Sequence, residues 1–454
     1  MKKGKLKIFS LLFGAALFLT GCATVSDVKI NGKEAYFKEA QYYQGQVVKV
    51  GDYLYYGNGY TASDSEGFSY KTATKLGYLS RLNVSKDLTY KSDVTLANKS
   101  NTTPKGVQQV NDEKLIGYQY QEMYALGEYI YFTSANTHKT SDMENDYSQV
   151  SLFRVKFNGD GLKELVKNSA FKTGEGSSIT LQKGSDGKYY FLIAEPTNDS
   201  TFTIKTLKVG DKIGELKTIV KKAKTYVLAD NKSAVRNIVY TVDSGKYQTT
   251  TAVKSIDFAT REETTLDNGE AGSETKLLDR VGDNIFYSYT MDSKTEVYQI
   301  SASSNNGYAP NDNKFFYART TISDVYKVGD GFVFKGESGG LLYQTLDSTS
   351  DPIPLATSED FTDVLFAEED YIYISNTTSI KRVSTIDQTL ETIISYDEDT
   401  IISGECGYAD GYIYYYSKIG ELELEDDEEQ ETDDNYYMYR TDKAGNTQLV
   451  GKTV

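Results

Sequence analysis

The sequence predicts an all-β protein built from repeats, and three observations lead to this prediction. A short aromatic strand recurs, a turn-forming pair with Gly and Asp or Glu usually precedes it, and five Pro with few Ala/Leu/Glu/Lys stretches leave little that reads as helix. Branched and aromatic residues favour strands because they pack well on a pleated surface. The eight copies are YLYY at 53–56, YIYF at 129–132, YYFLI at 189–193, NIVY at 237–240, NIFY at 284–287, GFVF at 331–334, YIYI at 371–374 and YIYYY at 412–416.

The spacing of these copies predicts one β-propeller. Their starts are separated by 76, 60, 48, 47, 47, 40 and 41 residues, and the last five intervals lie in or near the ~40–50 residues of a propeller blade. We therefore expect about eight four-stranded blades, with seven as the alternative. The early strand-like pieces at 28–49 are expected to complete the last blade and clasp the ring, because closure removes exposed sheet edges.

A single blade is predicted at 321–356, from TISDVYKV, GFVFKG, LLYQTL and DPIPLA. Turns that begin with Gly, such as Gly329-Asp330, suit type II′ hairpins, and Asp410-Gly411 suits type I′. A second signature follows the aromatic strand, and it reads SLFRV at 151–155, EVYQI at 296–300, LLYQT at 341–345, SIKRV at 379–383 and YMYRT at 437–441.

This pairing of a YIYY strand with an LYR strand resembles the tandem propeller-like repeats of lipoproteins from Gram-positive bacteria. The resemblance covers about 46–454 and implies an architecture, not an activity. It is also loosely similar to YWTD-type propellers, but Trp is absent from the chain, so no receptor function follows.

The N-terminus predicts export and lipid attachment. Four Lys in the first seven residues precede an apolar run from Ile8 to Leu19, which is too short to span a bilayer. The run ends in Leu19-Thr20-Gly21-Cys22, which resembles the lipobox of bacterial lipoproteins; an ordinary signal peptide is the alternative. We expect a signal peptide at 1–21, a lipid on Cys22, a tether at 22–27 and a propeller at 28–454. The protein would then lie on the extracellular face of the cell membrane, held by its lipid anchor.

The composition limits the kinds of partner that the protein is expected to bind. A formal charge of −16 repels nucleic acid, so no nucleic-acid partner is expected. Polar insertions at 57–75 and 95–116, with similar stretches at 133–149 and 303–313, read as surface loops. Loops on a rigid scaffold commonly bind partners, although loops without a role are the other interpretation.

Few residues in the sequence suggest a catalytic or metal-binding site. The single His, His138, lies in a polar loop, which excludes a Ser-His-Asp triad and a multi-His zinc site. Cys406 reads as a small buried strand residue. The acidic run at 421–434 reads as a solvated loop, and weak binding of divalent cations there stays open. NGDG at 158–161 reads as a turn before it reads as a calcium site.

These observations favour a non-enzymatic module without a cofactor, which binds a protein or a cell-wall glycan. The alternative is a propeller hydrolase that acts on glycans through Asp and Glu, since the 65 acidic residues cannot exclude paired carboxylates. A solute-binding lipoprotein fits poorly, because its lobes need alternating helices.

Overall fold

The computed structural model describes twenty stretches of the chain. They are 27–43, 47–58, 78–83, 107–109, 123–135, 149–166, 171–172, 174, 176–229, 235–244, 250–269, 271–291, 294–303, 323–336, 338–345, 351–376, 378–395, 401–402, 407–418 and 436–452. Within these stretches there is no helix, and therefore none that is long and apolar enough to cross a bilayer.

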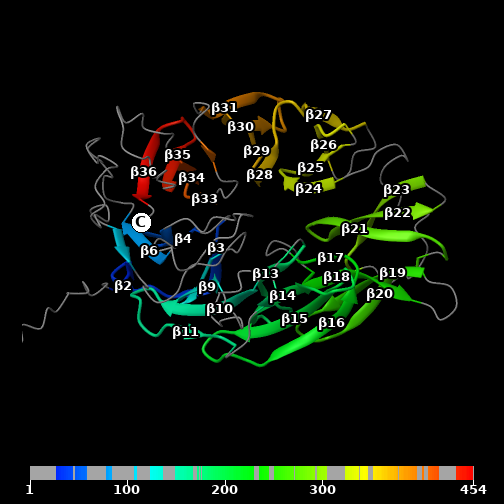
Figure 1. Ribbon diagram of the computed structural model, residues 1–454, viewed down its shortest axis with the longest axis horizontal. Helices are drawn as coiled ribbons and strands as arrows, with labels where there is room; N and C mark the ends of the chain where they lie inside the picture. Colours follow the sequence, from blue (N-terminus) through cyan, green and yellow to red (C-terminus); the bar gives the residue numbers. More distant parts are fainter. Residues whose placement is uncertain are drawn as a thin grey trace, which may run out of the picture.

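The described strands form eight sheets of three or more strands that follow one another around a ring (Figure 1). We name each sheet by the strand that carries the aromatic motif. The first four sheets are the β5 sheet, with β4 (Val47–Val50), β5 (Tyr53–Asn58), β6 (Tyr78–Asn83) and β7 (Val107–Gln109); the β9 sheet, with β3 (Phe37–Tyr42), β8 (Tyr124–Gly127), β9 (Tyr129–Ala135), β10 (Gln149–Lys156), β11 (Lys163–Glu164) and β12 (Phe171–Lys172); the β14 sheet, with β13 (Ser178–Lys183), β14 (Tyr189–Pro196), β15 (Phe202–Val209) and β16 (Leu216–Ala223); and the β18 sheet, with β17 (Tyr226–Val227), β18 (Asn237–Ser244), β19 (Thr250–Asp257) and β20 (Glu263–Asp267).

The other four sheets complete the ring. They are the β22 sheet, with β21 (Glu274–Val281), β22 (Asn284–Met291) and β23 (Lys294–Ser301); the β25 sheet, with β24 (Ser323–Val328), β25 (Gly331–Lys335), β26 (Leu341–Thr345) and β27 (Ile353–Ala356); the β29 sheet, with β28 (Asp363–Glu368), β29 (Tyr371–Asn376), β30 (Ser379–Ser384) and β31 (Leu390–Ser395); and the β34 sheet, with β32 (Ile401–Ile402), β33 (Gly407–Ala409), β34 (Tyr412–Lys418), β35 (Tyr436–Asp442) and β36 (Thr447–Lys452).

The prediction of an all-β propeller is confirmed. Each of the eight aromatic motifs lies on a different sheet, and the strands expected at 321–356 are β24 to β27 in the expected order. The turns also match, since φ is 58° at Gly51, 59° at Gly282 and 52° at Gly329. Asp410 and Gly411 both have positive φ, 56° and 82°, as a type I′ turn requires.

The expected role of residues 28–49 is wrong. β1 (Lys29–Ile30) and β2 (Lys33–Glu34) form a separate hairpin, β3 pairs with β8, and β4 opens the β5 sheet. The last sheet draws all its strands from 401–452, so its outer edge already has β36 and leaves no place for an N-terminal strand. Side chains close the ring instead: β33 lies against β4, and Lys49 forms an ion pair with Asp410.

The core lies between neighbouring sheets. In several copies of the motif the second residue is an aliphatic side chain that is fully buried, as at Leu54, Ile130 and Ile285. Clusters of such residues join one sheet to the next; one of them packs Phe366 and Tyr373 of the β29 sheet against Ile413 of the β34 sheet. Burial of this apolar surface is the main force that holds the sheets together.

The Arg of the third strand, which the LYR signature contains, has a structural role within the sheets. In four sheets an Arg of the third strand lies opposite the second Tyr of the motif: Tyr55 and Arg81, Tyr131 and Arg154, Tyr373 and Arg382, Tyr414 and Arg440. Each guanidinium also stacks on the first Tyr of the motif, with Cζ 4.1–4.7 Å from the ring centre. The sheet therefore holds a long cation against two aromatic rings, which favours burial of its charge.

Two of these Arg residues also join neighbouring sheets. Arg81 Nη1 donates to the carbonyl oxygen of Phe157 at 3.1 Å, and Arg154 Nη1 donates to that of Gly210 at 2.8 Å. Both acceptors are the first residue after the third strand of the next sheet around the ring. Ser255 Oγ makes the same link to Ala302 at 3.2 Å. The third strands therefore fasten successive sheets through one repeated contact.

Where the aromatic pair is missing, the Arg is missing as well. In the β22 sheet Asn284 takes the place of the first Tyr, and Gln299 Nε2 donates to its Oδ1 at 2.6 Å. In the β18 sheet Asn237 takes that place and donates to Ser255 Oγ at 2.7 Å. The substitutions keep a polar contact between the second and third strands and remove the buried charge.

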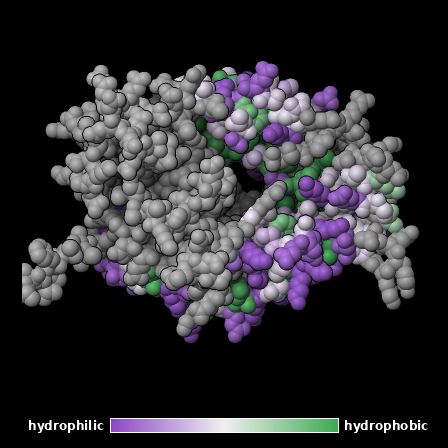
Figure 2. Space-filling view, in the orientation of Figure 1, coloured by the Kyte–Doolittle hydropathy of each residue, from purple (hydrophilic) through white to green (hydrophobic). Residues whose placement is uncertain are grey.

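The ring has two unlike faces. The turn face carries the connections from first to second strands, such as Gly51-Asp52 and Gly127-Glu128. The hairpin face carries the connections from second to third strands, such as 197–201 between β14 and β15. In the view of Figure 2 the described outer rim is mainly hydrophilic, and hydrophobic residues gather beside the central opening.

Candidate functional site

Most residues singled out in the sequence lie outside the described residues. These are Cys22, His138, Cys406, the acidic run at 421–434 and the larger parts of the four polar insertions. Their assignments stay predictions. Among the described residues, no group of three or more His, Cys, Asp or Glu could hold a metal ion.

The NGDG segment is described, and it forms a turn. Asn158 Oδ1 accepts the backbone N–H of Asp160 at 3.0 Å, and its amide donates to Asp160 Oδ2 at 3.0 Å. The same amide donates to Asp27 Oδ1 at 2.9 Å, so the turn also holds the start of the described chain. The polar side chains of this segment therefore stabilise the turn through hydrogen bonds.

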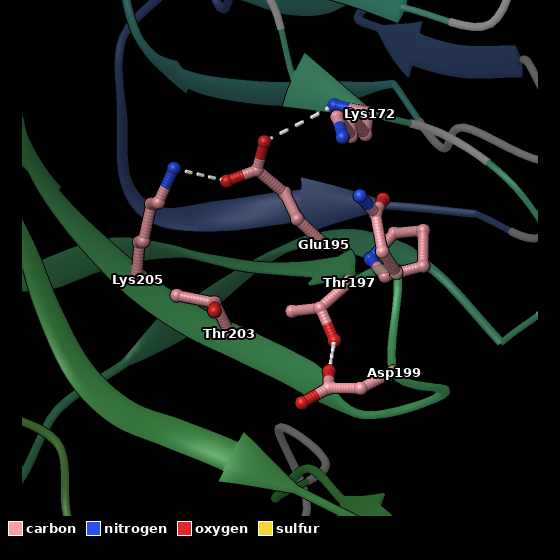
Figure 3. A pocket seen from close by; sticks show the side chains of 8 residues that line it. Lys172, Glu195, Thr197, Asp199, Thr203 and Lys205 are labelled. Carbon is pink, nitrogen blue, oxygen red and sulfur yellow. Dashed lines mark hydrogen bonds and ion pairs between the residues drawn. The ribbon is translucent and has the colours of Figure 1, made fainter.

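The candidate site is an open hollow of about 620 Å³ on the hairpin face (Figure 3). It lies where the hairpin between β14 and β15 meets the short strand β12, which pairs with β10 in the neighbouring β9 sheet. Two neighbouring sheets therefore contribute to it. Its lining residues are Lys172, Glu195, Pro196, Thr197, Asn198, Asp199, Thr203 and Lys205.

Glu195 is the buried charge of this hollow, with 8% of its surface exposed. Its Oε1 accepts the backbone N–H of Lys172 at 3.1 Å, and its Oε2 forms an ion pair with Lys205. In the strand pairing Glu195 lies opposite Thr203, while Lys205 lies opposite Ile193, so the two charges are diagonal neighbours on one face of the sheet. The carboxylate therefore joins β12 of one sheet to β15 of the next.

Asp199 forms the rim of the hollow. The hydroxyls of Thr197 and Thr201 both donate to its Oδ1, the second at 2.9 Å. These hydrogen bonds, that of Thr197 first, lower the pKa of Asp199 below its ordinary value. Its carboxyl is thus ionised at neutral pH and accepts hydrogen bonds, and it is a poor proton donor.

The remaining polar groups are open to a ligand. No hydrogen bond or ion pair within the described residues involves the Lys172 ammonium, the Asn198 amide or the Thr203 hydroxyl. Glu195 is offset by Lys205, and Asp199 has Lys222 at 3.8 Å. The Lys172 ammonium is therefore the positive charge available at this place, on a chain whose formal charge is −16. The arrangement suits a ligand that bears anionic and hydroxyl groups.

Sequence reasoning missed this hollow and placed the partner site at 57–75 and 95–116. The available signal was Glu195, a charge at the end of the apolar strand YYFLIAEP, followed by the turn TNDST. A charge in a buried strand needs a partner. Only the tertiary structure identifies that partner as Lys205 together with the N–H of β12.

No family model and no curated protein matches the chain. Similar solved structures include the β-propeller domain of the Trilobed protease from Pyrococcus furiosus, at 10% identity and a TM-score of 0.37, covering 90% of this chain and 97% of that one. Another is a lectin from Burkholderia pseudomallei, at 10% identity, a TM-score of 0.40 and coverage of 71% and 95%. A third is the Pyrococcus horikoshii acylaminoacyl peptidase, at 10% identity and a TM-score of 0.39, where 71% of this chain covers 50% of that one.

The expectation that the protein is not an enzyme is corrected by these structures. Two of the three come from peptidases, so a propeller chain of this kind does not exclude enzymatic activity. The single His and Cys406 do not decide this question, because carboxylates alone can perform hydrolysis and the chain has 65 acidic residues. At these identities and TM-scores the likeness assigns no activity to this chain.

Proposed function

We propose that the protein is a lipid-anchored propeller on the extracellular face of the membrane, and that it binds an anionic, hydroxyl-bearing ligand of the cell envelope. The observation that carries the binding part is the hollow at the β14–β15 hairpin, with an available ammonium and a buried carboxylate that holds two sheets together. The lipid anchor rests on the Lys-rich start and on Leu19-Thr20-Gly21-Cys22.

The binding part is tested by calorimetric titration with purified cell-wall glycan fragments and with a polyphosphate-bearing wall polymer. Lys172→Glu should weaken binding at least about tenfold, because it reverses the charge that faces the ligand. Lys212→Glu, the same change in the connection between β15 and β16 on the turn face, is the matched control and should bind like the unaltered protein. Equal affinity of all three proteins contradicts the assignment of the hollow.

The same titration separates binding from hydrolysis. Product formation from the glycan fragments that is lost in Glu195→Gln, with the fold retained, would favour the hydrolase that acts through Asp and Glu. Binding without product would favour the ligand-binding module.

The anchor is tested by the intact mass of the membrane-extracted protein. The mass should exceed that of the chain from Cys22 by at least two acyl chains, since two chains give persistent attachment. Cys22→Ala should move the protein to the soluble fraction. A Cys22→Ala protein that stays entirely with membranes contradicts the anchor.

A further inference from the structure

The described N-terminal segment, 27–36, lies on the turn face. Asn158, in the turn after β10, donates to Asp27 Oδ1 at 2.9 Å. A Cβ on Gly51, in the turn between β4 and β5, would lie 3.2 Å from Ile30 Cγ1 and 3.5 Å from Val28 Cγ1. Both turns belong to the turn face, so the chain reaches the ring from that side.

This attachment is firm. Val28 is 3% exposed within the first core cluster, and its carbonyl accepts the N–H of Ala35 at 2.9 Å. β3 then enters the ring from the turn face, with Phe37 opposite Gly127, and runs along β8 on the side toward the centre of the ring (Figure 1). Glu39 on β3 is held by Lys183 at 2.7 Å and by the Tyr189 hydroxyl at 2.6 Å. The place where the chain enters is therefore fixed relative to the ring.

The length of the tether decides the orientation of the ring. Five residue steps separate Cys22 from Asp27, and even a fully extended chain covers at most about 18 Å in that length. The eight residues of β15 alone, at about 3.3 Å each, separate the two faces by about 26 Å. A lipid on Cys22 can therefore reach the bilayer when the turn face lies toward it, and not when the hairpin face does.

We propose that the turn face rests against the phospholipid headgroups and that the hairpin face, with the hollow, points away from the membrane. This inference rests on the proposed lipid anchor. Several turn-face carboxylates are paired with cations, which lowers their repulsion of anionic headgroups: Glu128 with Lys156, Asp186 with Lys188, Asp283 with Arg280 and Asp410 with Lys49.

The orientation also places the described strand ends beside three of the polar stretches. The strand ends that flank 59–77, 136–148 and 419–435 belong to the pairs β5 and β6, β9 and β10, and β34 and β35, which connect second to third strands. These ends lie on the hairpin face. These described strand ends therefore lie on the side of the hollow, away from the lipid, whereas Asn83, which precedes 84–106, pairs with Tyr53 at the turn face.

The test uses the native lipoprotein in vesicles that contain a headgroup spin label. Cys406→Ser leaves no thiol besides Cys22, whose sulfur carries the lipid. A fluorophore is then attached to a new cysteine, in Lys212→Cys on the turn face or in Asn198→Cys on the hairpin face. Both sites are exposed and both flank β15, so they form a matched pair on one sheet.

The label at position 212 should be quenched at least about threefold more than the label at 198, because the two sites differ by about 26 Å in depth. Equal quenching, which an edge-on ring would give, or stronger quenching at 198 overturns the inference. The chain from Ala23 with an N-terminal hexahistidine tag, held on nickel-chelating lipid, gives the same readout if Cys22 carries no lipid. Failure of the anchor and failure of the orientation are thereby distinguished.

Discussion

Arg81 combines full burial with a structural role at the junction of two sheets. It is 0% exposed, its Cζ lies 4.3 Å from the Tyr53 ring centre, and Nη1 lies 3.2 Å from the Tyr55 hydroxyl. Its bond to the carbonyl of Phe157 crosses to the next sheet. A buried cation of this kind is tolerated only when its donors and its aromatic partners are in place.

Arg81→Ala is therefore expected to destabilise the protein by about 3–5 kcal/mol, since it opens a cavity beneath Tyr53 and Tyr55 and removes one of the two donors of the Phe157 carbonyl, leaving the Tyr55 hydroxyl as the other. Urea unfolding followed by tyrosine fluorescence measures the change. Lys212→Ala, an exposed cation, is the control and should stay within about 0.5 kcal/mol of the parent. A loss below 1 kcal/mol for Arg81→Ala would contradict the role of this repeated contact.

Buried tyrosines link stability to alkaline pH. Burial raises the pKa of Tyr55, Tyr414 and Tyr439 to about 12, against an ordinary value of 10.0. Between these values the folded chain binds more protons than the unfolded chain, so stability that is present below pH 10 falls as the pH rises through 12.

The expected slope is about −1.4 kcal/mol per pH unit for each such group within this window. Urea unfolding at a series of pH values, with phenolate absorbance as a second readout, checks it. Tyr55→Phe should lower the parent's stability at neutral pH and reduce the slope above pH 10. An unchanged slope in this variant would mean that Tyr55 does not contribute to the pH dependence.

The β25 strand departs from the motif in a way that its sheet requires. Gly331 stands where the β5, β9, β29 and β34 sheets have the first Tyr, and the ring of Tyr343 from β26 occupies the free space. A Cβ at this position would lie 2.3 Å from the carbonyl oxygen of Gln344 and 2.7 Å from Cε2 of Tyr343. In this sheet the aromatic ring therefore comes from the third strand, whereas in the other sheets named it comes from the second.

Gly331→Ala should therefore lower the free energy of unfolding by about 1–3 kcal/mol, because the strand or the ring must shift. Thermal and urea unfolding both measure this change. Asp330→Ala, one residue away in the exposed turn, is the matched control and should be close to neutral. If the two variants are equally stable, the close packing of Gly331 against Tyr343 does not contribute to the free energy of unfolding.

At the scale of the whole molecule, the ring closes through side chains and not through an exchanged strand. The N-terminal β4 meets the C-terminal sheet at β33 and at the Lys49–Asp410 pair. That pair is partly exposed and contributes little by itself, so closure depends on the contact of β33 with β4 and on the buried residues between the β29 and β34 sheets.

Removal of 396–454 is expected to open the ring and expose the apolar sides of the β29 and β5 sheets. The truncated protein should aggregate or associate, since open sheets and large apolar patches favour association. Size-exclusion chromatography with light scattering measures this. Removal of 1–26 is the control and should leave a monodisperse protein of the same size class as the parent body. A monomeric, cooperatively folding truncation would contradict the dependence of the ring on its last sheet.

The sequence by itself determined the all-β class, the propeller repeat, the position of every motif strand and the type of the Gly-first turns. These features are local, because strand propensity and turn chemistry act within a few residues. The LYR signature was also visible as a pattern, but the contacts of its Arg were not: Arg154 lies opposite Tyr131 within its own sheet and donates to the Gly210 carbonyl of the next sheet.

The tertiary structure alone decided the path of the N-terminal strand, the way the ring closes and the place of the hollow. Each depends on contacts between residues far apart in the chain: Glu39 with Lys183, Lys49 with Asp410, and Glu195 with the N–H of Lys172. An acidic residue in a strand predicts that a partner exists, and it carries no information about which distant element supplies it. The partner is determined only when the sheets pack into a ring. Packing buries each charge at a cost in free energy, and it also brings the distant group close enough to form a pair that offsets this cost.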